Sequence, residues 1–194
     1  MEKMKITIIL AFLIASTNTF SQEKNFSLEI GYPIELSNGN SSGLTGIINS
    51  RIKYRFWNTE SFGIGTSYSI DLLTGNITSE NKKESFTSHH FNLFGEVPLN
   101  SSKTLFTSLG AGYTTQSYYI TKIMDHGSGL ISSETEKTNV GGFNIDIGGS
   151  YDILKNFFIQ GTFQFIRLYV NDFLLEEKIG FNKNRLKVGV GYRF

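Results

Sequence analysis

The dominant pattern along this chain is a strict alternation of apolar and polar positions, repeated in segments of about ten residues. Alternation with a period of two places successive side chains on opposite faces of an extended strand. The C-terminal segment LKVGVGYRF shows this most clearly. One face carries Leu186, Val188, Val190, Tyr192 and Phe194, and the other carries Arg185, Lys187, Gly189, Gly191 and Arg193. A strand with such unequal faces separates two different media.

The alternation recurs often enough to predict an all-β chain. Segments with this pattern lie at about 26–36, 47–57, 62–72, 86–97, 104–120, 139–152, 157–170 and 185–194. Their connections alternate between short turns, which contain NTES, PLNSSK and ILKN, and longer stretches rich in Ser, Asn and Gly. Because an even number of strands with alternating turns and loops is typical of closed sheets, we predict an eight-stranded antiparallel up-and-down β-barrel.

Two orientations of the strand faces are open. A soluble barrel would turn its apolar face inward around an apolar ligand, whereas a membrane barrel would turn it outward to lipid. The polar face is rich in glycine, which suits a crowded and narrow lumen. The apolar face carries aromatic residues near the short turns, as a membrane interface requires: Tyr54, Phe56, Phe62, Tyr151, Tyr192 and Phe194. Both observations favour a transmembrane barrel.

The N-terminus has the features of a secretory signal peptide. Lys3 and Lys5 precede an apolar run over residues 6–15, and Thr19-Phe20-Ser21 is a plausible cleavage site. The run is too short for a transmembrane helix, which needs about 20 apolar residues. We therefore expect a signal peptide at 1–21 and a barrel domain at 22–194.

Composition narrows the range of functions. The charged fraction is 18%, below the roughly 25% of soluble domains, and the net charge of +1 gives no reason to expect a nucleic-acid partner. The chain has no cysteine, which excludes disulfides and thiolate metal sites.

The charges on the polar faces are expected to meet inside the barrel. Strand 26–36 carries Glu29 and Glu35, and closure places it between two strands that carry rows of basic residues. Eight strands leave an interior just wide enough for side chains, and unpaired buried charges are costly. We predict a polar lumen plugged by an ion-pair network of Glu29, Glu35, Arg51, Lys53, Arg55, Asp71, Glu96, Asp146, Arg185, Lys187 and Arg193.

The chain resembles the small eight-stranded outer-membrane β-barrel proteins of Gram-negative bacteria, especially those common in Bacteroidetes. The resemblance covers the chain from about Phe26 to Phe194 and includes LGAGY at 109–113 and VGVGYRF at its end. It implies an outer-membrane location with both termini on the periplasmic side. It also implies that Val190, Tyr192 and Phe194 form the C-terminal signal read by the barrel-assembly machinery.

The sequence offers little catalytic chemistry. Some eight-stranded barrels are lipid A hydrolases with a Ser–His pair, and His126-Gly127-Ser128 in the longest predicted loop is the candidate for such a pair here. A glycine-flanked loop holds a nucleophile and a base poorly. His89 and His90 point to opposite faces and cannot share a metal; we expect His89 at the outer interface and His90 in the lumen network. We therefore expect no catalytic residue, no metal and no cofactor.

Arg167 departs from the pattern, because it occupies an apolar-face position of segment 157–170 near the long loops. Near the interface it would reach lipopolysaccharide phosphates at a cost of about 0–1 kcal/mol. Alternatively, a bulge at Ile166 would turn Arg167 inward or into the loop.

Three functions follow from these features. The leading hypothesis is a non-enzymatic barrel that supports the envelope or presents extracellular loops to a partner. Its expected contacts are membrane lipids, lipopolysaccharide and an unknown loop partner. The alternatives are a lipid A-modifying hydrolase, which needs an aligned Ser–His pair, and a narrow pore or small-ligand transporter, which needs an open lumen.

Overall fold

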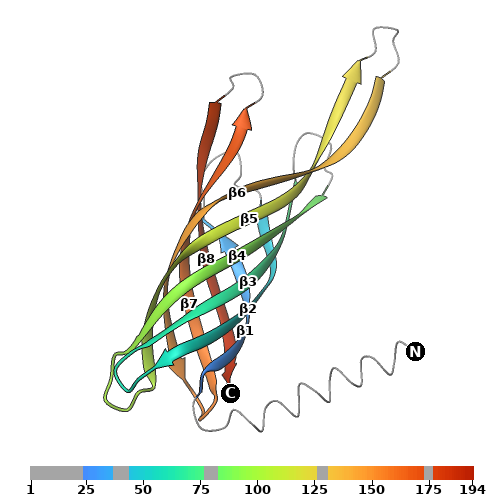
Figure 1. The fold of residues 1–194 in the computed structure, drawn as a ribbon. Helices are drawn as coiled ribbons and strands as arrows, with labels where there is room; N and C mark the ends of the chain where they lie inside the picture. Colours follow the sequence, from blue (N-terminus) through green and yellow to red (C-terminus); the bar gives the residue numbers. More distant parts are fainter. Residues whose placement is uncertain (1–23, 37–43, 77–82, 126–130, 173–176) are drawn as a thin grey trace, which may run out of the picture.

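The chain folds into one closed antiparallel barrel (Figure 1). The computed structural model describes residues 24–36, 44–76, 83–125, 131–172 and 177–194. Each strand pairs with its neighbours in chain order, as predicted for an up-and-down barrel. The strands are β1 (Phe26–Glu35), β2 (Leu44–Asn58), β3 (Gly63–Asn76), β4 (Lys83–Pro98), β5 (Leu105–Asp125), β6 (Ile131–Asp152), β7 (Phe157–Asp172) and β8 (Glu177–Arg193).

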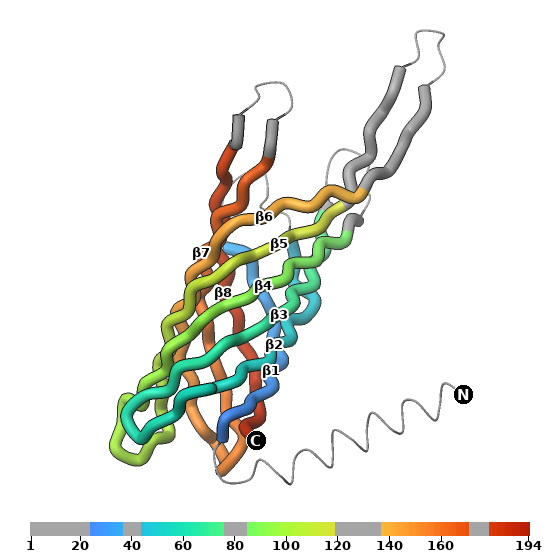
Figure 2. Tube along the Cα trace, in the orientation of Figure 1, coloured from blue at the N-terminus to red at the C-terminus, as the bar shows by residue number. Residues whose placement is uncertain are grey.

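The pairing of β1 with β8 closes the sheet, as the trace in Figure 2 shows. Their register runs from Ser27↔Arg193 to Glu35↔Arg185. Beyond it, the Phe194 amide donates to the Phe26 carbonyl at 2.8 Å. Closure removes both sheet edges, so the backbone satisfies its own hydrogen bonds in a medium without water.

The two ends of the barrel differ. The turn end carries the connections 59–62, 99–104 and 153–156 together with Phe26 and Phe194. The loop end carries the opposite ends of the strands. There β5 and β6 pair without interruption as far as Asp125↔Ile131, and β7 and β8 as far as Asp172↔Glu177. Two hairpins thus rise above the rest of the wall (Figure 1).

These hairpins are longer than the sequence pattern predicted. Segments 104–120 and 139–152 were expected, whereas β5 and β6 are 21 and 22 residues long. Alternation marks only the part of a strand that separates two media. A two-stranded ribbon needs backbone pairing but no apolar face, so its outer part carries no such signal.

The apolar face of the strands points outward, which excludes the soluble-barrel orientation. Ile30 is 58% exposed, Leu93 63% and Leu109 59%. The alternate residues Glu29, Asn92 and Gly110 are buried. A continuous exposed apolar band of this kind is stable only against lipid.

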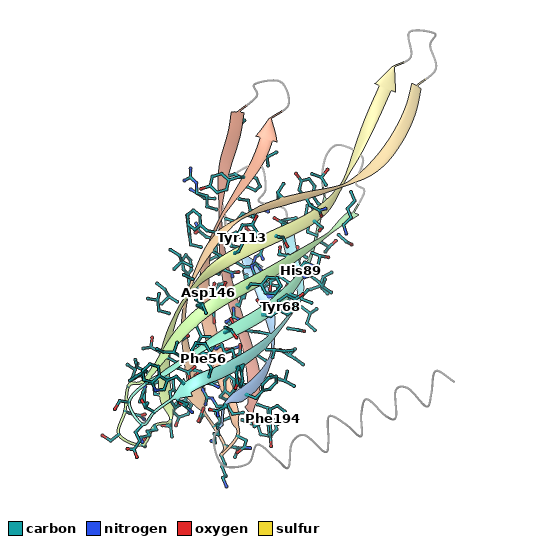
Figure 3. All side chains as sticks on the ribbon, in the orientation of Figure 1. Phe56, Tyr68, His89, Tyr113, Asp146 and Phe194 are labelled. Carbon is teal, nitrogen blue, oxygen red and sulfur yellow. The ribbon has the colours of Figure 1, made fainter. Side chains whose placement is uncertain are left out.

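Aromatic rings gather at the turn end of this band. Tyr192 packs edge-on against Phe157 and Phe194 at centroid distances of 4.8 Å, and Trp57 lies 5.5 Å from Phe62. Figure 3 shows Phe56 and Phe194 at this end, with Tyr113 and His89 nearer the loop end. Of the aromatic residues expected at the membrane interface, Phe62, Tyr192 and Phe194 therefore pack against other rings at this end.

Some predictions concern residues outside the described ranges. These are the signal peptide at 1–21 and the His126-Gly127-Ser128 sequence. Among the described residues, no helix is long and apolar enough to span a bilayer.

Glycine at position 112 is required by strand spacing. A Cβ on Gly112 of β5 would overlap the Phe91 carbonyl and the Asn92 backbone of β4. Gly95, on β4, has nothing within 4 Å of its Cβ position. Gly112→Val is expected to reduce the fraction of chains that refold in detergent micelles, because β4 and β5 must separate to admit the side chain. The measurement is the shift between unheated and boiled samples on an SDS gel.

Gly95→Val is the matched control, since it adds the same side chain on the open outer face of the adjacent strand. Equal folded fractions for the two variants would contradict the spacing argument.

Candidate functional site

The inner face of the barrel is the most chemically specialised region of the described chain. All eleven charged residues predicted to form the lumen network point inward, and each takes part in at least one ion pair. They form three clusters along the barrel axis.

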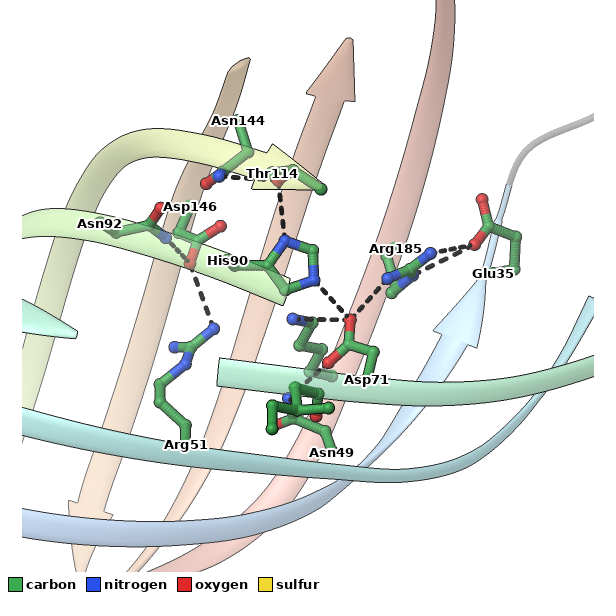
Figure 4. Close-up of polar contacts among 12 residues, drawn as sticks. Glu35, Asn49, Arg51, Asp71, His90, Asn92, Thr114, Asn144, Asp146 and Arg185 are labelled. Atoms are coloured by element: carbon green, nitrogen blue, oxygen red, sulfur yellow. Dashed lines mark hydrogen bonds and ion pairs between the residues drawn. The ribbon is translucent and has the colours of Figure 1, made fainter. Parts of the chain in front are cut away.

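The first cluster is centred on Asp71 of β3, and Figure 4 shows it. Its Oδ2 atom lies 2.5 Å from Arg185 Nη1 and 2.9 Å from Lys187 Nζ, both on β8. The Asn49 amide donates to Asp71 Oδ1 at 2.5 Å. Arg185 also donates to Glu35 Oε2 from Nε at 3.1 Å and from Nη2 at 2.9 Å. The two buried carboxylates Asp71 and Glu35 thus both pair with Arg185, and Asp71 also pairs with Lys187.

The second cluster lies closer to the turn end and crosses the barrel axis. Lys53 Nζ is 2.9 Å from Glu29 Oε1, and Arg51 Nη2 on β2 is 3.1 Å from Asp146 Oδ2 on β6. Asn92 also donates to Asp146, at 2.8 Å. The Lys53–Glu29 pair joins the neighbouring strands β2 and β1, whereas both contacts of Asp146 join strands that do not share a backbone ladder.

The third cluster occupies the turn end. Arg55 donates to Glu96 Oε1 from Nη2 at 2.9 Å, and Arg193 pairs with Asp152. The Arg193 guanidinium lies between two inward rings, with Cζ 4.2 Å from the centroid of Phe158 and 4.7 Å from that of Phe106. A desolvated guanidinium is stabilised in this position by the faces of both rings.

A cavity of about 690 Å³ opens below this cluster, lined in part by Arg55, Asp152 and Lys24. Lys24 precedes β1 and donates to the Lys155 carbonyl. Burial lowers the pKa of the Lys24 ammonium, and the Asp152 carboxylate acts in the opposite direction. The charges around this mouth are of mixed sign, so it has no strong preference for anions or cations.

An apolar layer, which the sequence reasoning did not predict, lies inside the barrel at the loop end. Val140, Ile166 and Leu168 form a buried cluster against Tyr118, and Tyr118 stacks on Phe86 at 5.9 Å. Ile166 and Leu168 are 1% and 0% exposed. They share the inner face with Gln164, because side chains alternate along β7. The sequence does contain a sign of this layer, because residues 165–170 are mostly apolar at both odd- and even-numbered positions.

Three inner side chains have the connectivity of a catalytic triad. The Thr114 hydroxyl lies 2.8 Å from His90 Nδ1, and His90 Nε2 lies 3.0 Å from Asp71 Oδ2. A hydroxyl, imidazole and carboxylate in this order is the pattern of nucleophilic hydrolases. Here, however, Thr114, His90 and Asp71 are 0%, 1% and 0% exposed, so a substrate cannot reach the hydroxyl. The triad is part of the polar packing.

The two adjacent histidines lie on opposite faces, as the alternation predicted. His90 is in the lumen, whereas His89 Nδ1 lies on the outer face 2.8 Å from the Tyr68 hydroxyl. In the part of the chain that the structure describes, no group of three or more metal-ligating side chains converges.

Arg167 lies on the outer face near the loop end. The registers of β7 with β6 and with β8 continue without a shift through Phe143↔Arg167↔Asn182. This excludes the alternative in which a bulge at Ile166 turns Arg167 inward.

Asp71 is the carboxylate that pairs with both Arg185 and Lys187 in the lumen. Asp71→Asn is expected to lower the free energy of unfolding by about 3–5 kcal/mol, because it leaves Arg185 and Lys187 buried with less negative charge. The measurement is urea unfolding in detergent micelles.

Glu60→Gln is the control, since Glu60 pairs with Lys103 at 3.3 Å on the exposed surface. That change is expected to leave the unfolding curve in place, because exposed pairs contribute little. A curve for Asp71→Asn that overlays the curve for Glu60→Gln would contradict the central role of Asp71.

Comparison with solved structures finds small outer-membrane barrels. Ail, the attachment invasion locus protein of Yersinia pestis, is 16% identical with a TM-score of 0.53, over 87% of this chain and 97% of that chain. Ail in complex with the heparin analogue sucrose octasulfate gives 15% identity and a TM-score of 0.55, with the same coverage of both chains. Neisserial surface protein A gives 14% and 0.50, over 87% and 96%. At these identities the likeness concerns the fold.

Comparison with curated proteins by sequence finds no match. The family described as "Outer membrane protein beta-barrel domain" matches residues 7–194, nearly the whole chain. The closed eight-stranded barrel, its lipid-facing apolar band and this match agree, and the chain belongs to the outer membrane protein β-barrel domain family.

Proposed function

We propose that this outer-membrane protein is a sealed, non-enzymatic barrel that presents its two projecting hairpins outside the cell. The observation that carries the proposal is the double closure of the lumen. A polar network around Asp71 fills the middle, and the apolar layer of Ile166 and Leu168 covers it towards the loop end.

The two layers oppose different solutes, which supports a barrier role. An ion moving along the axis would have to displace Arg185 or Lys187 from Asp71 and then pass the side chains of Val140, Ile166 and Leu168, which offer no hydrogen bonds. An apolar solute would cross that layer but would meet the paired charges below. This arrangement argues against the pore and transporter alternatives.

The hairpins supply the surface for recognition. β6 leaves β7 above Gly141↔Tyr169, and β8 leaves β1 above Glu35↔Arg185. Each hairpin continues as a two-stranded ribbon that adds nothing to the barrel wall. Loops and ribbons carried on a rigid scaffold are common sites of binding.

The orientation follows from the same proposal. We place the turn end and both termini in the periplasm, with residues 1–21 removed as a signal peptide during export. Val190, Tyr192 and Phe194 would then be read by the barrel-assembly machinery on the periplasmic side, and Arg167 would face the outer leaflet and its lipopolysaccharide.

The hydrolase alternative has little support in the described residues. His90 is sealed inside the lumen, and the ring nitrogen Nδ1 of His89 is engaged by Tyr68. Neither histidine has a serine hydroxyl among its hydrogen-bond partners in the described ranges.

A sealed lumen predicts that the protein conducts no ions across a bilayer. The purified protein, inserted into planar bilayers, is expected to give no stepwise current at voltages where a trimeric porin added by the same procedure conducts. Regular unitary steps that scale with the amount of protein would overturn the proposal in favour of the pore.

Single-cysteine labelling tests the orientation, because the natural chain contains no cysteine. Lys137→Cys lies at an exposed position of the β5–β6 hairpin, and Ser101→Cys lies in an exposed turn at the other end. A membrane-impermeant maleimide is expected to label Lys137→Cys on intact cells, and Ser101→Cys only after the outer membrane is opened. The reverse pattern would contradict the proposed orientation.

A further inference from the structure

The barrel wall contains a groove where the two long hairpins part. β6 pairs with β7 only as far as Gly141↔Tyr169; beyond this point β6 pairs with β5 alone and β7 with β8 alone. Figure 1 shows the two hairpins diverging. A groove of about 740 Å³ lies at this fork. Its lining includes Tyr113, Val140, Gly141, Phe143 and Tyr169.

Glycine and aromatic residues shape the groove. The Tyr113 hydroxyl occupies the space that a Cβ on Gly141 would need, so the ring reaches across the backbone of β6. Phe143 and Tyr169 are on the outer face and 40% and 39% exposed. Rings with an apolar body and a hydroxyl tip are typical of the boundary between hydrocarbon and head groups. The side of the groove formed by Tyr113, Phe143 and Tyr169 therefore faces lipid at the level of that boundary.

The Arg167 guanidinium lies beside the groove. Arg167 pairs with Phe143 across the β6–β7 ladder, and its Cζ is 5.8 Å from the centroid of the Tyr169 ring. Its Nε and Nη2 atoms lie 3.1 Å from the position of a Cβ on Gly180, two residues closer to the loop end than Asn182. The side chain thus extends along the wall towards the head groups, as long cationic side chains do at membrane interfaces.

Arg167 forms no ion pair with any acidic residue whose side chain the structure describes, a set that leaves out residues 131–136 and 171–178. This distinguishes it from the lumen arginines, each of which is paired. A guanidinium binds phosphate through two parallel hydrogen bonds, which makes an unpaired arginine at this level a ready phosphate site.

We propose that the groove and Arg167 together form one site for lipid A, the phosphorylated and acylated lipid of the outer leaflet. One acyl chain lies along Phe143 and Tyr169, and a phosphate binds the Arg167 guanidinium. A phosphate monoester on a sugar offers more charge and more free oxygens to the guanidinium than the phosphodiester of a phospholipid, so lipid A is preferred. The assignment rests on the proposed orientation, in which the loop end faces outward.

The test is a lipid titration of the full barrel in detergent micelles, read by native mass spectrometry with purified lipid A or phosphatidylglycerol as the probe. Lipid A is expected to bind in a one-to-one complex and more tightly than phosphatidylglycerol. Arg167→Gln removes the charge and is expected to weaken lipid A binding about tenfold or more. Arg167→Lys keeps the charge without the planar fork and should fall between the two.

Gly141→Leu fills the groove and is expected to weaken lipid A binding as strongly as Arg167→Gln, without a change of charge. Gly161→Leu is the matched control, because Gly161 is also on the outer face of the wall and has nothing within 4 Å of its Cβ position. Each variant is first shown to fold by its shift on an SDS gel. If Gly141→Leu does not fold, the ranking of wild type, Arg167→Lys and Arg167→Gln decides the question.

Three results would overturn the site: wild-type binding by Arg167→Gln, wild-type binding by a folded Gly141→Leu, or equal affinity for phosphatidylglycerol and lipid A. If any of these results is found while Lys137→Cys is still labelled on intact cells, the lipid site is contradicted and the proposed function is not. Labelling of Lys137→Cys only after the outer membrane is opened would instead remove the orientation on which both depend.

Discussion

The interior of this barrel depends on the pairing of buried charges. Eight strands enclose a space that side chains fill, so every charge placed inside must meet an opposite charge there. Asp71 on β3 meets Arg185 and Lys187 on β8, and Arg51 on β2 meets Asp146 on β6. None of these strands are neighbours in the sheet, so the ion pairs join parts of the wall that no backbone ladder joins. The backbone ladders close the barrel, and the ion pairs connect strands on opposite sides of the lumen.

The same packing determines where function can reside. In the function proposed above, the polar network opposes the passage of apolar solutes and the apolar layer opposes the passage of ions. Even the hydroxyl–imidazole–carboxylate sequence of Thr114, His90 and Asp71 is unavailable for chemistry, because it is enclosed. The surfaces that remain accessible are the hairpins and the outer wall. There the parting of β6 from β7 leaves a groove beside Arg167, which pairs with no acidic residue whose side chain the structure describes.

Alternation in the sequence was sufficient to predict much of the fold and of the lumen. It indicated the number of strands and their faces, and it placed Glu29 beside the basic row of the next strand, where Lys53 and Arg51 now meet it. It did not predict the apolar layer. Ile166 lies in a run that is apolar at both parities, and such a run does not show which of its residues face inward. Nor did it predict the length of the β5–β6 hairpin, because a ribbon outside the membrane needs no amphipathic pattern.

The sequence by itself determined that this chain forms strands with one apolar and one polar face, because period-two patterning acts along a single strand and requires no knowledge of its neighbours. Only the tertiary structure decided which charges meet, since the partners of Asp71 are set by the tilt and register of strands on opposite sides of the lumen. It also decided that β6 parts from β7 at Gly141 and that Arg167 stays outside. Both depend on how two strands pair, and the sequence of either strand alone does not specify that pairing.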